Sequence, residues 1–297
     1  MTAPRLALVT CSLFPDLHPQ DQLLREALTV RSAVAEGCLW DDPSVDWASY
    51  DLVVLRSPWD YSGRRDEFVS WAESVPRLAN PAAVVRWNTD KRYLRSLAEL
   101  GVPVVPTSWL EPGDAVVLPE NGEFVVKPAI SAGASDTGRY DAGDPAHLPL
   151  ARDLAGRLLA AGRTVMVQPY MADIDTAGET ALLFLGGEFS HAVRKGPILA
   201  GPFLEGTSVR PGEDIAPRSP SDLECAVADQ VLAAARECVP SASETTYARV
   251  DLVPGPDGTP LLLELELTEP YLFLEDAPGA TDRLADVLMR TVRTAAR

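Results

Sequence analysis

The chain has 297 residues, of which 46% are hydrophobic and 23% charged, with a formal net charge of −17 and an isoelectric point near 4.6. This length predicts two or three domains with a large buried core. The acidic balance argues against a nucleic-acid partner, because proteins that bind a phosphate backbone need a basic surface.

The cysteines and the hydropathy favour a cytoplasmic protein. We expect no membrane partner, since the first apolar run, residues 6–9, is far too short to cross a bilayer and ends at Thr10. No secretory leader is recognisable. The cysteines lack the spacing of a metal site; they are Cys11, Cys38, Cys225 and Cys238.

The amino-terminal third alternates strand and helix patterns, which predicts an α/β unit. Apolar runs typical of buried strands lie at 5–10 and 52–56, and helical patterns at 20–28 and 64–74. Ligands of such sheets bind at the carboxyl ends of the strands. The loop Arg56-Ser57-Pro58-Trp59-Asp60-Tyr61 follows a strand directly and is therefore a candidate binding loop. The alternative is a proline turn whose aromatic rings pack into the core.

A helix is predicted to begin at Asn88-Thr89-Asp90 and to end at Gly101. Asn88 or Thr89 would cap it, and Gly101 would follow its last turn. Lys91 would then lie in the first turn, where the helix dipole disfavours a cation unless an anion binds there. Either this lysine contacts a phosphate, or it is solvated beside Asp90.

The next strand pattern, residues 124–128, carries Lys127 near its end and precedes a loop of small residues that includes Ser131 and Gly133. Backbone N–H groups of small residues can approach phosphate oxygens closely, and the lysine adds a charge. The lysine precedes the loop, so this is not the G-x-x-x-x-G-K-[ST] motif. A phosphate cover is predicted, with an ordinary flexible connection as the alternative.

After a helical pattern at 148–161, the strand 164–168 is stopped by Pro169. Backbone groups freed at Gln168-Pro169-Tyr170-Met171 can bind the edge of an adenine ring, unless this segment is a plain crossover between lobes. A hairpin at 179–185 and 188–194 follows. Glu179 opens the hairpin, and Arg194 and Lys195 close it.

The strand from Leu261 to Leu267 carries Glu264 and Glu266 at positions i and i+2, and Asp251 lies on an upstream strand. Side chains alternate along a strand, so the two glutamates share a face roughly 6.5 to 7 Å apart. They repel each other unless a cation lies between them. Such oxygen ligands favour Mg²⁺ bridging nucleotide phosphates. An amphipathic strand with a merely solvated polar face is the alternative.

Taken in order, these motifs resemble the ATP-grasp superfamily, and most of all the branch of glutathione synthetase and the ribosomal-protein glutamyl ligases. The resemblance implies a mixed α/β and α+β fold. It divides the chain into an amino-terminal α/β domain (1–87), a central lid domain (88–167) and a carboxyl-terminal α+β domain (168–297), with ATP between the last two. The loop at 130–138 and the segment 196–210 would close over the reacting groups.

The resemblance also implies roles for single residues. In that branch an arginine stands two places after the ribose-binding acid, but this chain has Ala181 there. Arg194, Lys195 and Arg249 are therefore candidates for the catalytic cation. The implied ligands are Lys91, Lys127, Ser131 and Gly133 for the phosphates, the backbone of Gln168, Pro169, Tyr170 and Met171 for adenine, Glu179 for ribose, and Asp251, Glu264 and Glu266 for two Mg²⁺ ions.

The implied reaction activates a substrate carboxylate as an acyl phosphate, which a nitrogen nucleophile attacks with formation of ADP. The Arg56–Tyr61 loop and the hairpin resemble cyclo-ligases of this superfamily that close O-ureido-D-serine into D-cycloserine, an antibiotic. Another carboxylate–amine ligase, a phosphotransferase and a non-catalytic ATP-binding module are the alternatives, and a homodimer stays open. A small amino-acid-like substrate would be lined by Arg56, Trp59, Asp60, Tyr61, Arg249, Glu269 and Tyr271.

Overall fold

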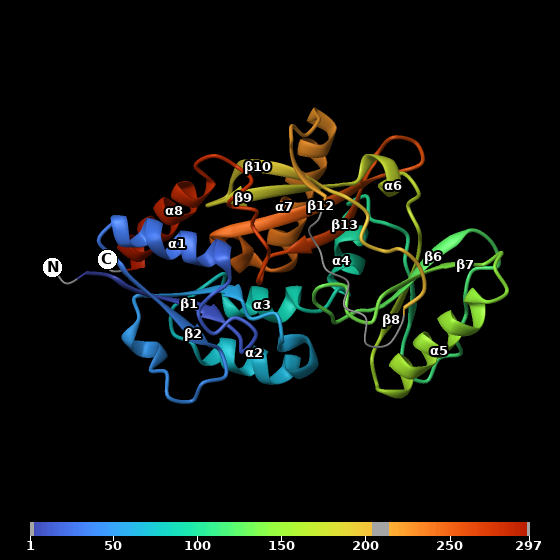
Figure 1. Ribbon diagram of the computed structural model, residues 1–297, viewed down its shortest axis with the longest axis horizontal. Coiled ribbons are helices and arrows are strands. Elements are labelled where there is room, and N and C mark those ends of the chain that lie inside the picture. The colour runs from blue at the N-terminus through green and yellow to red at the C-terminus, as the bar shows by residue number, and fades with distance from the viewer. Residues whose placement is uncertain (1–2, 204–213, 296–297) are drawn as a thin grey trace.

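In the computed structural model, which describes residues 3–203 and 214–295, the chain folds around three β-sheets spread along the long axis of the molecule (Figure 1). The first sheet is parallel, with the order β2-β1-β3-β4. Alternate residues of β1 face different layers: Leu6 and Leu8 pack toward α1, whereas Ala7 and Val9 pack toward α2. The elements of this unit are β1 (Arg5–Thr10), α1 (Pro19–Val30), β2 (Val34–Leu39), η1 (Trp47–Ser49), β3 (Leu52–Ser57), η2 (Tyr61–Arg64), α2 (Arg65–Ser74), β4 (Leu78–Ala79) and α3 (Ala82–Asn88).

The second sheet is antiparallel, has the order β5-β8-β6-β7, and lies at one end of the molecule (Figure 1). It has a hydrophobic core of its own, in which Phe124 and Val126 pack against Leu154 and Leu158 of α5. Its strands are β5 (Ser108–Leu110), β6 (Glu123–Pro128), β7 (Gly138–Asp141) and β8 (Val165–Pro169), and α5 spans His147–Ala160.

The third sheet is antiparallel, with the order β11-β10-β9-β12-β13. Helix α7 packs against β12, β13 and α4, while α8 packs against β9, β10 and α1. A capping box formed by Ser221 and Glu224 begins α7. The elements are α4 (Tyr93–Glu99), α6 (Ile174–Ala177), β9 (Glu179–Leu185), β10 (Glu188–Lys195), β11 (Ile215–Arg218), α7 (Asp222–Cys238), η3 (Pro240–Glu244), β12 (Tyr247–Pro254), β13 (Pro260–Glu266) and α8 (Ala280–Ala295).

The first and third sheets are joined by a common core. Leu6, Leu24 and Leu28 of the amino-terminal unit lie in one buried cluster with Leu183 of β9 and Leu284 of α8. The central sheet, in contrast, buries most of its apolar side chains within its own cluster. The third sheet, which includes β13, therefore packs against elements from both ends of the chain.

Most of the predicted elements are confirmed, including the hairpin, in which Gly186 and Gly187 have φ values of 62° and 84°. The helix predicted from Asn88 is wrong in its start. Asn88 is the last residue of α3, and α4 begins only at Tyr93, so Lys91 lies between two helices. Part of the predicted segment 196–210, residues 204–210, lies outside the described residues. Among the helices that the structure describes, none is long and apolar enough to cross a membrane.

Candidate active site

Three carboxylates from two neighbouring strands converge. Asp251 of β12 lies directly opposite Glu264 of β13, and Glu266 follows on the same face. Each of the three offers an oxygen within 4.8 Å of the others. Asp251 is only 1% exposed. These hard oxygen donors fit Mg²⁺, which binds through carboxylates together with phosphate oxygens.

All three lysines of the chain surround these carboxylates. Lys91 Nζ lies 3.0 Å from a Glu264 oxygen, and Lys195 Nζ lies 2.7 Å from an Asp251 oxygen. The Glu264 charge also acts on Lys127, although burial dominates there and lowers the pKa of Lys127 to about 8. The chain has only three lysines, and this scarcity is a sequence signal for the site that the spacing of the motifs does not contain.

Arg249 is the fourth cation of the cluster. Its guanidinium donates to both Asp251 oxygens, at 2.9 and 3.0 Å, and to a Glu266 oxygen. Burial by itself raises the pKa of Asp251, but Arg249 and Lys195 outweigh burial and hold that pKa below its usual value. Burial raises the pKa of Glu266 to about 7 despite Arg249, and Glu264 adds to this effect. The neighbouring cations thus favour the ionised carboxylate most at Asp251 and least at Glu266.

The free edge of β13 is completed by two side chains. Asn88 donates to the Leu265 carbonyl (2.8 Å) and accepts from the Leu267 N–H (2.7 Å). The Tyr93 hydroxyl lies 2.9 Å from the Leu265 carbonyl and accepts from the Leu265 N–H at 2.8 Å. These contacts fix the backbone between the two glutamates. They also explain why Asn88 does not cap a helix, since its amide is used on the strand.

Lys91 lies within this same segment and links β13 to the small-residue loop. Its backbone N–H donates to the Ala129 carbonyl (2.9 Å), and its Nζ donates to the Ser131 carbonyl (3.0 Å). Arg163, which the sequence did not point to, holds the loop from the other side through Asp136 (2.6 Å) and the Ile130 carbonyl (2.9 Å).

The loop itself contains three residues with positive φ within four positions. Gly133, Ala134 and Asp136 have φ values of 60°, 57° and 53°, a left-handed conformation that glycine adopts freely and other residues adopt at a cost. Ser131 is 8% exposed and faces Lys91. The loop is therefore a shaped element and not a plain connection.

The segment predicted to bind adenine is partly engaged already. The Tyr170 N–H donates to the Glu123 carbonyl (2.8 Å), and Arg139 covers the Tyr170 ring at 3.6 Å. Gln168 is buried and donates to Thr107 (2.8 Å), while Pro169 is exposed and Met171 is 9% exposed. In this conformation the Tyr170 N–H is therefore paired within the protein and Arg139 lies over the ring, while the adenine contact of this segment stays a prediction.

The two cations that close the hairpin point to opposite faces, as successive strand residues must. Lys195 bridges Asp251 and Glu179, with its Nζ 2.8 Å from a Glu179 oxygen. Arg194 instead bonds the Ala177 carbonyl (3.0 Å) and Asp214 (2.7 Å), away from the acids. Ala181 lies opposite Asp251 on β9. Of the three candidate cations, Lys195 and Arg249 therefore lie at the acids and Arg194 does not.

The amino-terminal loop meets the turn that follows β13. The Trp59 indole donates to the Glu269 carbonyl (3.0 Å), and Tyr61 of the same loop is buried. Burial raises the pKa of Glu269 to about 8, and the Glu266 charge adds to this effect. Asp60 accepts from Trp40 (2.8 Å).

Arg56 differs from expectation. Its side chain is 0% exposed and pairs at 3.0 Å with Asp21, which is also 0% exposed. It donates to the Pro270 carbonyl as well (3.4 Å). A fully buried, paired arginine has no surface for a substrate, so its place in the structure is that of a support between the amino-terminal unit and the turn after β13.

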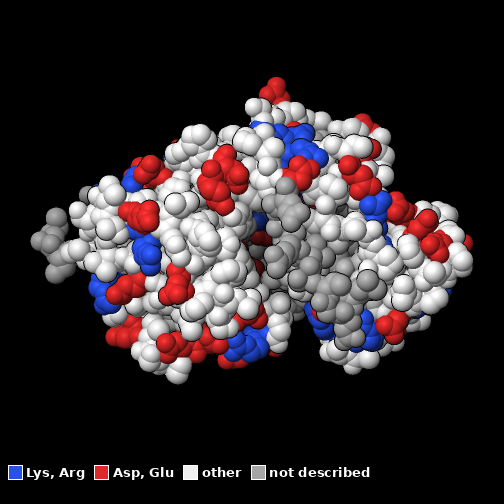
Figure 2. Space-filling model, in the orientation of Figure 1, with Lys and Arg blue, Asp and Glu red and all other residues white. Residues whose placement is uncertain are grey.

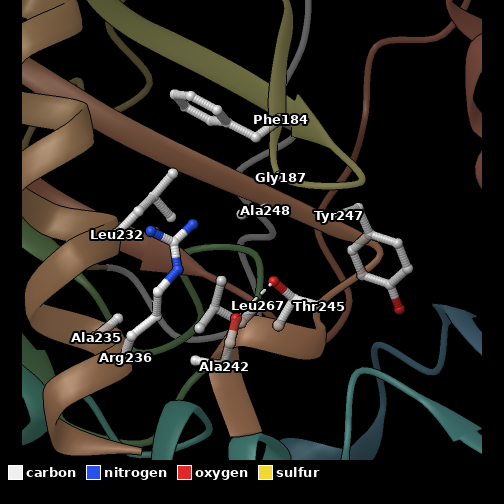
Figure 3. A pocket seen from close by; sticks show the side chains of 10 residues that line it. All are labelled: Phe184, Gly187, Leu232, Ala235, Arg236, Ala242, Thr245, Tyr247, Ala248 and Leu267. Carbon is white, nitrogen blue, oxygen red and sulfur yellow. Dashed lines mark hydrogen bonds between the residues drawn. The ribbon is translucent and has the colours of Figure 1, made fainter. Parts of the chain in front are cut away.

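Two pockets among the described residues are lined by none of the three acids. One, of about 10 Å³, lies between Phe184, Leu232 and Arg236, where it has room for about one water molecule (Figure 3). The other, of about 390 Å³, is an open groove beside Arg25 and Val34. Figure 2 instead shows a hollow in the middle of the molecule with both basic and acidic atoms at its floor.

Comparisons with known proteins decide the family. Residues 6–80 match the family described as D-cycloserine synthetase DcsG, N-terminal domain. The cycloserine biosynthesis protein DcsG of Streptomyces lavendulae is 39% identical over 301 residues, which cover 97% of this chain and 99% of that protein. The chain belongs to the DcsG family.

Solved structures agree with this assignment. A crystal structure of D-cycloserine synthetase DcsG has a TM-score of 0.86 and 37% identity, covering 97% of this chain and 99% of that one. A RimK domain protein of the ATP-grasp type from Sphaerobacter thermophilus has a TM-score of 0.67 at 16% identity, covering 96% and 99%, and shares the fold. The ATP-grasp fold predicted for this DcsG-family chain is thus confirmed.

Proposed function

We propose that this DcsG-family chain is an ATP-dependent, Mg²⁺-dependent carbon–nitrogen ligase that cyclises O-ureido-D-serine to D-cycloserine, with release of ADP and phosphate. The observation that carries the proposal is the convergence of Asp251, Glu264 and Glu266 with every lysine of the chain and with Arg249. The name of the S. lavendulae relative, which is 39% identical, supports the choice of product.

The nucleotide would lie between the central and third sheets. Lys91 and Lys127 would hold its phosphates, with Ser131 and Gly133 of the loop covering them. Glu179 would bind the ribose, and the segment from Gln168 to Met171 would contact the adenine ring. When bound, two Mg²⁺ ions on the three carboxylates would neutralise phosphate charge.

Lys195 and Arg249 would stabilise the charge on the transferring phosphoryl group, since both lie beside Asp251. The substrate carboxylate attacks the γ-phosphorus, which gives an acyl phosphate and ADP. The ureido nitrogen next to oxygen then attacks the acyl carbon and loses its proton, phosphate leaves, and the ring closes. Hydrolysis of the remaining carbamoyl group releases carbon dioxide and ammonia.

The test measures ADP and D-cycloserine formed from ATP, Mg²⁺ and O-ureido-D-serine. We expect the wild type to form both, and Glu264→Ala to lose at least a hundredfold in rate because a metal ligand and the partner of Lys91 disappear. Glu188→Ala is the matched control, because Glu188 is an exposed glutamate at the start of β10 in the same sheet. Equal rates for wild type and Glu264→Ala would refute the metal role.

The same assay distinguishes two other functions from the proposed one. ADP formed only with another amino acid or peptide would identify a different carboxylate–amine ligase, and hydroxylamine would trap its acyl phosphate as a hydroxamate. Binding of ATP without turnover of any substrate would favour a regulatory module. The domain limits at residues 87 and 167, a homodimer and a cytoplasmic location stay predictions from the sequence.

A further inference from the structure

Four aromatic side chains from three separate segments meet beside the proposed active site. Phe14 and His18 come from the connection between β1 and α1, Trp59 follows β3, and Tyr271 follows β13. His18 is central, with ring centroids 5.0 Å from Phe14, 5.2 Å from Trp59 and 5.4 Å from Tyr271. We call these four residues the aromatic wall.

The wall does not have the burial of a core. All four residues are only partly buried, whereas the core aromatic residues Trp40 and Phe68 of the same unit are 1% and 0% exposed. The wall also lies at the carboxyl ends of β1 and β3, where parallel sheets bind their ligands. Aromatic faces that stay partly accessible at that place are suited to contact a small molecule.

Hydrogen bonds tie the wall to the acidic cluster. The Tyr271 carbonyl accepts from Arg249 (3.0 Å), the same guanidinium that bonds Asp251 and Glu266. The Trp59 indole donates to the Glu269 carbonyl (3.0 Å). A small substrate whose carboxylate lies at Arg249 therefore has its other end within reach of the wall.

The base of the wall is rigid and fully buried. Arg56 joins Asp21 of α1 to the Pro270 carbonyl, and Gln20 accepts from the Leu272 N–H (3.2 Å). These contacts hold the first turn of α1 against the segment that carries Tyr271. The wall is thus set before any ligand arrives, which lowers the entropic cost of binding.

The chemistry of the wall selects for a planar, uncharged group. His18 Nδ1 accepts from the Gln20 N–H (3.4 Å), which places the ring proton on Nε2, and burial lowers the pKa of His18, so the imidazole is neutral near pH 7. Among the described residues, Nε2 has no hydrogen-bond partner and is a free donor. A neutral N–H donor beside these rings matches an amide-like carbonyl better than a carboxylate, which needs a cation, and the N–H offers no lone pair to an ammonium.

We infer that Phe14, His18, Trp59 and Tyr271 form the subsite for the planar ureido end of the substrate, with His18 donating to its carbonyl oxygen. This inference rests on the proposed function and extends it, because it assigns the residues that distinguish a ureido substrate from other amino acids. The reactive carboxylate then points to Arg249, and the ureido group folds back between the wall and the acyl carbon.

The test uses two variants that spare the acidic cluster. His18→Asn keeps a side-chain oxygen that can cap α1 but removes the ring, and Phe14→Leu removes one aromatic face. We expect each variant to raise the KM for O-ureido-D-serine about tenfold, because each loses one aromatic contact or hydrogen bond. The KM for ATP should stay unchanged. Phe189→Leu is the control, since Phe189 is 47% exposed and packs on Phe184 of the third sheet.

Binding gives a second measurement that does not depend on turnover. Addition of O-ureido-D-serine should change the tryptophan emission of the wild type, and Trp59→Phe should abolish the change. An unchanged KM in both His18→Asn and Phe14→Leu would overturn the subsite, and so would an equal rise in the KM for ATP, which would assign the wall to the nucleotide. A wild type that forms no ADP from O-ureido-D-serine would instead overturn the proposed function itself.

Discussion

Replacing Tyr93 by phenylalanine should weaken metal binding without touching a metal ligand. The Tyr93 hydroxyl is hydrogen-bonded to both backbone groups of Leu265, at 2.8 and 2.9 Å, and Leu265 lies between Glu264 and Glu266. Without the hydroxyl, the Leu265 carbonyl keeps its bond from Asn88, but the N–H loses its partner. Of the two side chains that hold this part of β13, only Asn88 then remains.

The magnitude follows from that single orphaned group. Leu265 is 1% exposed, so water does not replace the lost partner, and a buried unsatisfied N–H costs about 1–3 kcal/mol. For a chain of this size, each kcal/mol lowers the melting temperature by roughly 2–4 °C. Because the strand relaxes between two metal ligands, we expect the Mg²⁺ concentration at half-maximal rate to rise severalfold.

The assay pairs thermal unfolding with Mg²⁺ titration of ADP release and with Mn²⁺ binding followed by electron paramagnetic resonance. Tyr247→Phe is the matched control, since the Tyr247 hydroxyl is equally buried and bonds the carbonyls of Leu55 (2.7 Å) and Thr268 (3.2 Å), outside the acidic pair. Both variants should melt earlier, but only Tyr93→Phe should bind Mn²⁺ more weakly. Equal metal affinities in the two variants would refute the positioning role of Tyr93.

Three further predictions concern Lys127 and Arg56. With a pKa of about 8, half of the Lys127 side chains are neutral at pH 8. Burial lowers the pKa of Lys195, but Asp251 and Glu179 outweigh burial and raise it, so acetic anhydride should label Lys127 before Lys195. MgATP should protect Lys127, and labelling of Lys195 first would contradict this assignment. In the unfolded chain Lys127 keeps its ammonium proton up to about pH 10.5, whereas in the folded chain it loses the proton near pH 8. The free energy of unfolding should therefore rise between about pH 8 and 10.5, and Lys127→Met should flatten that rise in urea unfolding. Arg56→Met should lower the free energy of unfolding by about 3–5 kcal/mol because it leaves Asp21 buried and unpaired. The double variant Arg56→Met, Asp21→Leu should recover most of this loss. An Arg56→Met protein that is as stable as the wild type but has a raised substrate KM would instead show direct substrate contact.

Local patterns were sufficient for the strands, the hairpin and the acidic motif. Glu264 and Glu266 share a face because the period of a strand is two, and the hairpin turn needs two glycines because both residues take positive φ. Lys127 precedes its loop in the sequence, so its place at the end of β6 also follows from the chain order. These features depend only on neighbours along the chain.

Other features depended on partners far away in sequence. Asn88 reads as a helix cap, yet it bonds β13 some 177 residues later, and no local pattern shows that preference. Arg56 follows a strand as a binding residue would, but Asp21 and Pro270 enclose it. Arg194 and Lys195 were equal candidates until the packing of β10 decided which face meets Asp251. The sequence by itself determined which groups could do the chemistry, because residue type and spacing set their local geometry. Only the tertiary structure decided which of them meet, because burial and pairing depend on residues brought together by the fold.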